Sequence, residues 1–195
     1  MMLLTARDRE LPSVLIAAYS PIRTCELERA SFEDINWSNS TIAVYADDAK
    51  TDATRFIYLV PELVAKLQPF RTRIGRISPY KSLSRFWPRL ARKAKVTWRK
   101  NGWRTAVLSY LVAYTQNYEG VAGQAGTSVK QLKNTYVTAV PFETGATWFG
   151  LTASDFHPLR PVSFVVNSSA QTGPQPRDDQ GEGSKIVPFV AAAAR

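Results

Sequence analysis

The chain has 195 residues, of which 45% are hydrophobic, and a formal net charge of +9, which fits one globular domain with a core. No apolar run approaches the roughly 18 residues of a membrane span, and the N-terminus lacks a signal-peptide pattern. With one cysteine and one histidine, the chain can form neither an intrachain disulfide nor a Cys/His zinc site, and we expect a reducing, cytoplasmic setting and no cofactor.

The first half of the chain predicts one helix and one β-hairpin. Residues 8–18 read as a short helix that ends at Ser20, because the residue before a proline is driven out of the helical region. Residues 41–46 alternate and are rich in β-branched side chains, which is typical of a strand, and residues 54–60 read as the returning strand. Lys50 then lies at the tip of the hairpin.

The second half predicts further helices and a tail. A short helix begins at Pro61, a basic loop follows, and a helical segment over residues 82–95 is interrupted at Pro88. Apolar residues recur at helical spacing from Gly102 to about Gln116, which indicates a buried helix. Shorter helices are expected over residues 119–126, 128–137 and 142–151. Residues 156–195 are rich in Gly, Pro, Ser and Gln and are expected to be a disordered tail.

The positive charge is concentrated in the middle of the chain. Residues 63–118 contain no Asp or Glu but about half of the chain's 25 Lys and Arg, interleaved with aromatic residues. Such a cluster indicates a polyanion partner, although a solvated basic face is the plain alternative. The residues that we expect to bind DNA are Arg71, Arg73, Arg76, Lys81, Arg85, Arg99 and Lys100.

Several short motifs with polar and charged residues follow one another along the chain in a defined order. They are Arg23 and Glu26 in "IRTCEL", Lys50 in the hairpin, Asn101 and Arg104 in "NGWR", Thr127 in "AGT", and Tyr136 nine positions after Thr127. This order and spacing over residues 5–150 resemble the catalytic domain of the tyrosine recombinases, the phage integrase family. Taken singly, Arg23 could be a plain surface arginine, Asn101 a helix cap and Tyr136 a packed aromatic residue.

The resemblance implies a fold and a set of roles. The fold is of the α+β class, mainly helical, with a small antiparallel sheet, and residues 1–155 form the catalytic-like domain. Arg23 and Arg104 would hold the scissile phosphate, Lys50 would protonate the leaving oxygen, and Tyr136 would be the nucleophile. Glu26 would orient the arginine or a neighbouring backbone group.

Departures from the family pattern shape the expected function. Asn101 and Thr127 stand where the family has histidine or tryptophan, and we expect an N-terminally truncated, partly degenerate recombinase without the core-binding domain. The expected function is DNA integration or recombination on double-stranded DNA, with activity weak or lost. The alternatives are a non-catalytic DNA-binding remnant and a basic protein associated with RNA or the ribosome. The resemblance also implies a homo-oligomer on DNA, associated with the nucleoid, although no clear docking helix follows residue 150.

Overall fold

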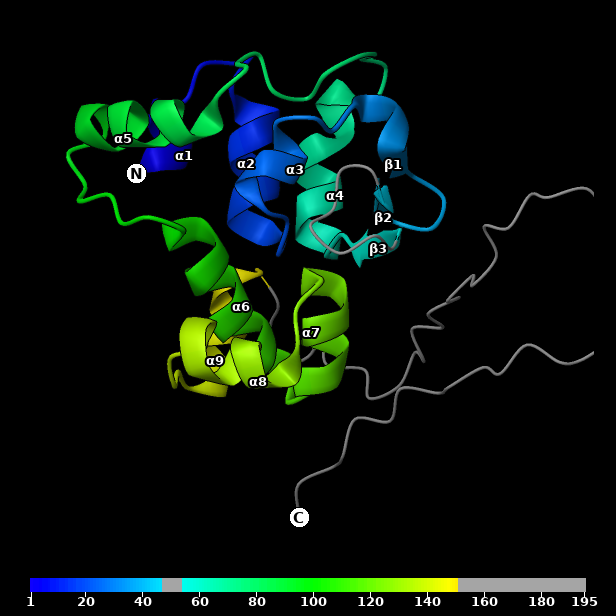
Figure 1. The fold of residues 1–195 in the computed structure, drawn as a ribbon. Helices are drawn as coiled ribbons and strands as arrows, with labels where there is room; N and C mark the ends of the chain where they lie inside the picture. Colours follow the sequence, from blue (N-terminus) through cyan, green and yellow to red (C-terminus); the bar gives the residue numbers. More distant parts are fainter. Residues whose placement is uncertain (47–53, 151–195) are drawn as a thin grey trace, which may run out of the picture. The chain divides into compact units, whose positions relative to one another are not determined.

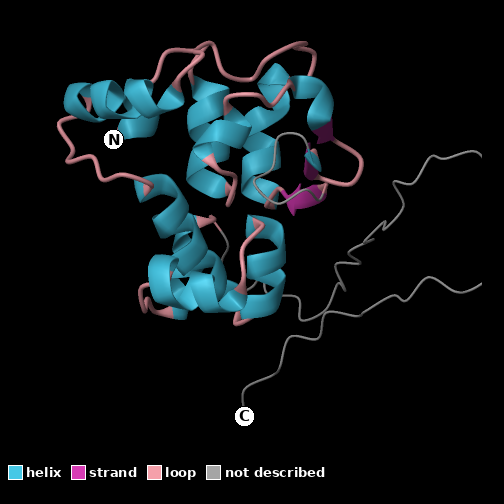
Figure 2. Ribbon diagram, viewed as in Figure 1, coloured by secondary structure: helices cyan, strands magenta, loops and turns pink. Residues whose placement is uncertain are grey.

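The computed structural model describes residues 1–46 and 54–150, all within one compact unit of the chain. The predicted hairpin tip with Lys50 and the predicted tail lie outside the described residues. The described part is mainly helical with one small sheet (Figures 1 and 2). No helix in it is long and apolar enough to cross a membrane.

Short helices and one sheet make up the first half of the described chain. The helical elements are α1 (Met2–Thr5), α2 (Leu11–Tyr19), α3 (Thr24–Leu27), the 3-10 turn η1 (Phe32–Asp34), α4 (Pro61–Leu67) and the 3-10 turn η3 (Gln68–Phe70). Helix α2 has Pro12 in its first turn and ends at Tyr19, with Ser20 as its C-cap, so the predicted helix is confirmed with a later start. Helix α3, with only four residues, was too short for its periodicity to be visible.

The sheet is antiparallel and has the order β1 (Ile35–Asn36), β2 (Thr41–Val44) and β3 (Arg55–Tyr58). Strands β2 and β3 pair from Thr41 opposite Tyr58 to Val44 opposite Arg55, which confirms the predicted hairpin. Ile42, Val44 and Ile57 are buried at every second position, as the alternation predicts. The two-residue strand β1 was not predicted.

The second half consists of helices. They are α5 (Leu83–Lys93), α6 (Gly102–Thr115), α7 (Tyr118–Ala125), α8 (Val129–Gln131), the π-helical turn η4 (Leu132–Tyr136) and α9 (Phe142–Trp148). Helix α6 packs against α2, α7, η4 and α9 (Figure 1), and its side chains Val107, Leu108, Leu111 and Val112 belong to the core. The predicted buried helix is therefore confirmed.

The expected interruption of α5 at Pro88 is wrong, because the helix continues through this residue. Pro88 has no N–H to donate to the carbonyl of Ser84. Because Ser84 is exposed, water can donate a hydrogen bond to that carbonyl instead. Phe86, Trp87 and Leu90 are buried along one face of α5 and stabilise the helix through packing. Trp87 is only 2% exposed and belongs to the core.

Candidate active site

Arg23 is held at the start of α3 by Glu26. The backbone of Arg23 is extended, and its N–H donates to Glu26 Oε2 at 2.8 Å, which is one half of a capping box. The side chain returns to the same carboxylate, with Arg23 Nη1 2.7 Å from Glu26 Oε1. Glu26 therefore begins the helix and fixes the arginine side chain at the same time.

Arg104 lies in the first turn of α6 and is only 6% exposed. Its Nη1 donates to the carbonyl of Pro21, and its Nη2 donates to the carbonyl of Ala125 at 2.7 Å. Its Nε is buried and has no hydrogen-bond partner among the described residues. Burial, and next the positive charge of Arg23, lower the pKa of Arg104 from the ordinary arginine value.

Tyr136 ends the π-helical turn η4 and is half-buried. The guanidinium carbon of Arg104 lies 5.2 Å from the centre of its ring. Ser109 of α6 lies against the backbone that follows Tyr136. Its hydroxyl accepts the N–H of Thr138 at 3.0 Å, and its one hydrogen is shared between the Thr105 carbonyl at 2.9 Å and the Tyr136 carbonyl at 3.2 Å. The tyrosine is thus held beside Arg104 through its backbone as well as its ring.

Arg23 and Arg104, the two arginines predicted to hold the phosphate, both donate hydrogen bonds to the end of α7. Gly126 closes this helix with a positive φ of 61°, which favours glycine. Its carbonyl accepts from Arg23 Nη2, while the preceding carbonyl of Ala125 accepts from Arg104. Thr127 follows, half-buried, with its N–H 3.0 Å from the Ala122 carbonyl. Residues far apart in the sequence therefore meet at one turn.

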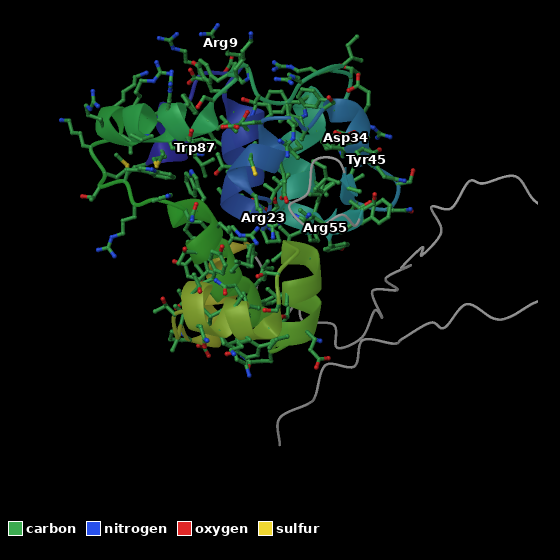
Figure 3. The ribbon with its side chains drawn as sticks, viewed as in Figure 1. Arg9, Arg23, Asp34, Tyr45, Arg55 and Trp87 are labelled. Carbon is green, nitrogen blue, oxygen red and sulfur yellow. The ribbon has the colours of Figure 1, made fainter. Side chains whose placement is uncertain are left out.

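Arg55 is a further member of this cluster that the sequence analysis missed. It is the first residue of β3, and its Nη2 lies 2.6 Å from Glu26 Oε2. Its Nε donates to the carbonyl of Gln124 at 2.9 Å. Figure 3 labels Arg55 and Arg23 near each other, at one end of α7. The missed signal was the alternation of β3, which places Arg55 on the same face as the buried Ile57.

The Glu26 carboxylate is shared between these two arginines. Its side chain is 1% exposed, and burial alone would raise its pKa. The hydrogen bonds from Arg55 and from the side chain and backbone of Arg23 outweigh burial, so the pKa of Glu26 lies below its ordinary value. Glu26 is consequently ionised at neutral pH.

The remaining predicted site residues are Asn101, at the start of α6, and Lys50. Asn101 is exposed at the start of α6, with φ of 60° and no capping hydrogen bond from its side chain. Lys50 lies outside the described residues. Among the described residues, no group of three or more His, Cys, Asp or Glu could hold a metal ion.

The residues predicted to bind DNA are exposed at the surface. Arg71 lies over the ring of Trp37, 5.8 Å from its centre, and Arg73 over the ring of Phe70 at 4.6 Å. The others, likewise exposed, are Arg76, Lys81, Arg85, Arg99 and Lys100. Arg99 and Lys100 line a hollow of about 260 Å³ that Ser109 also lines, next to the segment that holds Tyr136.

Comparisons with known proteins identify the fold. No family model and no curated protein matches the chain. Among solved structures, the XerA recombinase matches with a TM-score of 0.53 and 18% identity, over 79% of this chain and 58% of that one. The Tn1549 transposon integrase, solved in complex with a circular intermediate DNA, matches with a TM-score of 0.52 and 16% identity, over 70% of this chain and 56% of that one. The described chain therefore has the fold of a tyrosine recombinase catalytic domain, and it spans less than two thirds of these two chains.

Proposed function

We propose that this protein is a tyrosine recombinase that binds double-stranded DNA and cleaves and rejoins it through Tyr136, with weak activity. The observation that carries the proposal is the convergence of Arg23 and Arg104 on the end of α7, with the Arg104 guanidinium carbon 5.2 Å from the ring centre of Tyr136. Three residues that the sequence motifs singled out thus meet within a fold shared with a recombinase and an integrase.

The chemistry needs neither metal nor ATP. The Tyr136 hydroxyl gives its proton to solvent and attacks phosphorus, a 3′-phosphotyrosyl bond forms, and the bond to the 5′-oxygen breaks. The leaving oxygen takes a proton, the role proposed for Lys50. Arginine donors stabilise the charge that develops on the non-bridging oxygens, which is the role proposed for Arg23 and Arg104. The reverse attack by a 5′-hydroxyl rejoins a strand and frees the tyrosine.

We expect weak activity because protein oxygen atoms already accept hydrogen bonds from Arg23 and Arg104. Arg104 is 6% exposed, and both of its Nη atoms already donate to backbone carbonyls. Arg23 likewise donates to Glu26 and Gly126. A phosphate must use the remaining hydrogens of these groups or displace the carbonyls. Asn101 and Thr127 are neutral, so neither can shuttle a proton in place of histidine.

Exposed cations supply the proposed DNA-binding surface. Arg71 and Arg73 lie over aromatic rings, which already restrict both side chains in the free protein. The conformational entropy that they lose on binding DNA is therefore smaller. Arg99 and Lys100 border the hollow next to the Tyr136 segment. Clustered cations of this kind bind a phosphate backbone by releasing its counterions. Association with the nucleoid, and with further copies of the chain on DNA, belongs to the same proposal.

The test is relaxation of supercoiled plasmid without metal or ATP, followed by a detergent quench. We expect relaxed topoisomers and protein-linked DNA from the wild-type protein and neither from Tyr136→Phe. The control is Tyr118→Phe, which keeps the ring that Lys133 contacts at 4.6 Å and is expected to behave as wild type. Relaxation that persists in Tyr136→Phe would overturn the proposed nucleophile.

A non-catalytic DNA-binding remnant is the second candidate. The engagement of Arg23 and Arg104 by protein acceptors favours it, since a site that never binds a scissile phosphate needs no free donors there. This candidate predicts salt-sensitive binding to duplex DNA without relaxation or covalent adduct. Preference for structured RNA over duplex DNA in a competition experiment would count against both candidates.

A further inference from the structure

Arg55 connects three parts of the chain that the sequence keeps far apart. Its backbone belongs to β3 and pairs with Val44 of β2. Its Nη2 lies 2.6 Å from Glu26 Oε2 in α3, and its Nε lies 2.9 Å from the carbonyl of Gln124 in α7. Gln124 also contacts β3 through its side chain, whose oxygen accepts the backbone N–H of Tyr58 at 3.1 Å. The first strand residue after the hairpin loop is therefore tied to the turn that holds Arg23.

The contacts of Glu26 make Arg55 and Arg23 interdependent. Oε1 accepts from Arg23 Nη1, and Oε2 accepts from both the Arg23 backbone and Arg55 Nη2. With the Glu26 side chain 1% exposed, little water can replace a lost donor. If Arg55 is removed, Glu26 Oε2 keeps only the Arg23 backbone N–H of these two donors, and the carboxylate is free to turn away from the Arg23 guanidinium. The direction of the Arg23 side chain thus depends on Arg55.

Gly126 brings the two guanidinium groups together from the other side. A Cβ at this position would lie 3.0 Å from Arg55 Cζ and Nε and 3.1 Å from Arg23 Nη1. Both cations therefore pack against one glycine and share one carboxylate. Glu26 lies between these two like charges. Each guanidinium donates a further hydrogen to one backbone carbonyl, Arg23 to Gly126 and Arg55 to Gln124. Arg55 Nη1 is buried with no hydrogen-bond partner among the described residues.

We propose that Arg55 is a positioning residue of the recombinase site, which fixes the direction of the Arg23 guanidinium through the shared Glu26 carboxylate and the α7 turn. This inference deepens the proposed function and rests on it for its catalytic consequence. The positioning itself is a property of the free protein. It can therefore be measured whether or not the protein cleaves DNA.

The first experiment records the arginine side-chain NMR signals of the protein labelled with 15N-arginine. Assignment by Arg23→Lys identifies the Arg23 guanidinium, which we expect to rotate slowly about its terminal bond in the wild-type protein. In Arg55→Met, we expect the Arg23 guanidinium to rotate freely, so that its separate Nη signals merge into one averaged signal. Arg7→Met removes one cation at an exposed position outside the cluster and is expected to leave the Arg23 signals unchanged.

Arg55→Lys keeps the positive charge and is the variant to use for the same NMR measurement if Arg55→Met does not fold. A single ammonium group cannot reach Glu26 and the Gln124 carbonyl in the geometry of the guanidinium fork, so the Arg23 signals are expected to average in part. If Arg55 only stabilised the fold, the melting temperature would fall while the Arg23 signals kept their slow rotation. Slow rotation in a folded Arg55→Lys protein would overturn the inference.

The catalytic consequence is measured separately, as the rate of adduct formation on supercoiled plasmid. A misdirected arginine is expected to lower this rate on the order of a hundredfold in Arg55→Met, with a smaller loss in Arg55→Lys. A wild-type protein that forms no adduct would contradict the proposed function and leave the NMR result to decide the positioning. An unchanged rate in Arg55→Met, with wild-type protein active, would overturn the catalytic consequence of the inference.

Discussion

Arg104 lies with its guanidinium carbon 5.2 Å from the ring centre of Tyr136, and its two Nη atoms donate to the carbonyls of Pro21 and Ala125. The same side chain therefore holds the turn before Arg23, the end of α7 and the tyrosine ring in contact. Any substitution of Arg104 changes both the packing and the proposed chemistry. Stability has to be measured beside activity for every variant of this residue.

Arg104→Lys is expected to lower the free energy of unfolding by about 1–3 kcal/mol, because one ammonium group cannot satisfy two separated carbonyls and one of them stays buried and unpaired. The measurement is urea unfolding followed by tryptophan fluorescence. Arg92→Lys, an exposed change in α5, is the control and should stay within about 0.5 kcal/mol of wild type. Equal stability of the two variants would contradict the described role of Arg104.

Gly126→Ala is expected to lower the free energy of unfolding by about 1–2 kcal/mol from the left-handed backbone alone. The added Cβ would also meet Arg55 at 3.0 Å and Arg23 at 3.1 Å, so both guanidiniums must move. The matched control is Gly123→Ala in α7, where a Cβ meets nothing within 4 Å and alanine should add up to about 1 kcal/mol. Thermal melting of the two variants should therefore shift in opposite directions, and a shift in the same direction would contradict the geometry at Gly126.

Glu26 is expected to make the stability of the protein depend on pH. Its folded-state pKa is lowered, so its contribution is fully present above the unfolded-state value of about 4.3 and is lost as the pH falls through the folded-state pKa. Glu26→Gln lacks this contribution. The stability difference between wild type and Glu26→Gln should therefore be largest near neutral pH and shrink on acidification, as measured by urea unfolding at a series of pH values.

Glu143→Gln is the control for the loss of one negative charge at an exposed position. It should leave the stability near the wild-type value at neutral pH. A difference between wild type and Glu26→Gln that stays constant with pH would show that the carboxylate charge does not stabilise the two arginines.

Arg73→Gln and Arg85→Gln are each expected to weaken duplex DNA binding and to reduce the slope of log affinity against log salt by about 0.9. Fluorescence anisotropy with a random-sequence duplex measures this slope. The control is Lys66→Gln, which changes the net charge equally at a residue paired with Glu62 at 2.7 Å and outside the proposed surface. If Lys66→Gln changed the slope as much as the other two, net charge rather than a defined surface would govern binding.

The sequence predicted those elements whose pattern is long enough to be periodic. Helix α6 was predicted because its apolar residues recur over four turns, and the β2–β3 hairpin because buried and outward residues alternate. Helix α3 and strand β1 were too short to show a period. Pro88 was taken as an interruption, since the packing of Trp87 that outweighs one missing hydrogen bond depends on tertiary structure.

The candidate site was predicted as far as spacing in the sequence carries information. Arg23, Arg104 and Tyr136 were singled out from their order, and in the structure Arg23 and Arg104 donate to adjacent carbonyls while Arg104 lies over the Tyr136 ring. Their catalytic roles stay a prediction. Arg55 was missed because its partner Glu26 lies in another segment, and no local pattern links the two. The alternation of β3 could have indicated it, since an arginine on the inward face of a strand requires an acidic partner.

The most direct test of the central claim is to identify the amino acid that becomes bonded to DNA. Wild-type protein is incubated with supercoiled plasmid and quenched with detergent, the adduct is digested with nuclease and trypsin, and peptides that carry nucleotides are sequenced by mass spectrometry. The account predicts a nucleotide on Tyr136, in the peptide that follows Lys133, and no such peptide from Tyr136→Phe. A nucleotide on any other residue, or no adduct from a folded protein that binds duplex DNA, would contradict it.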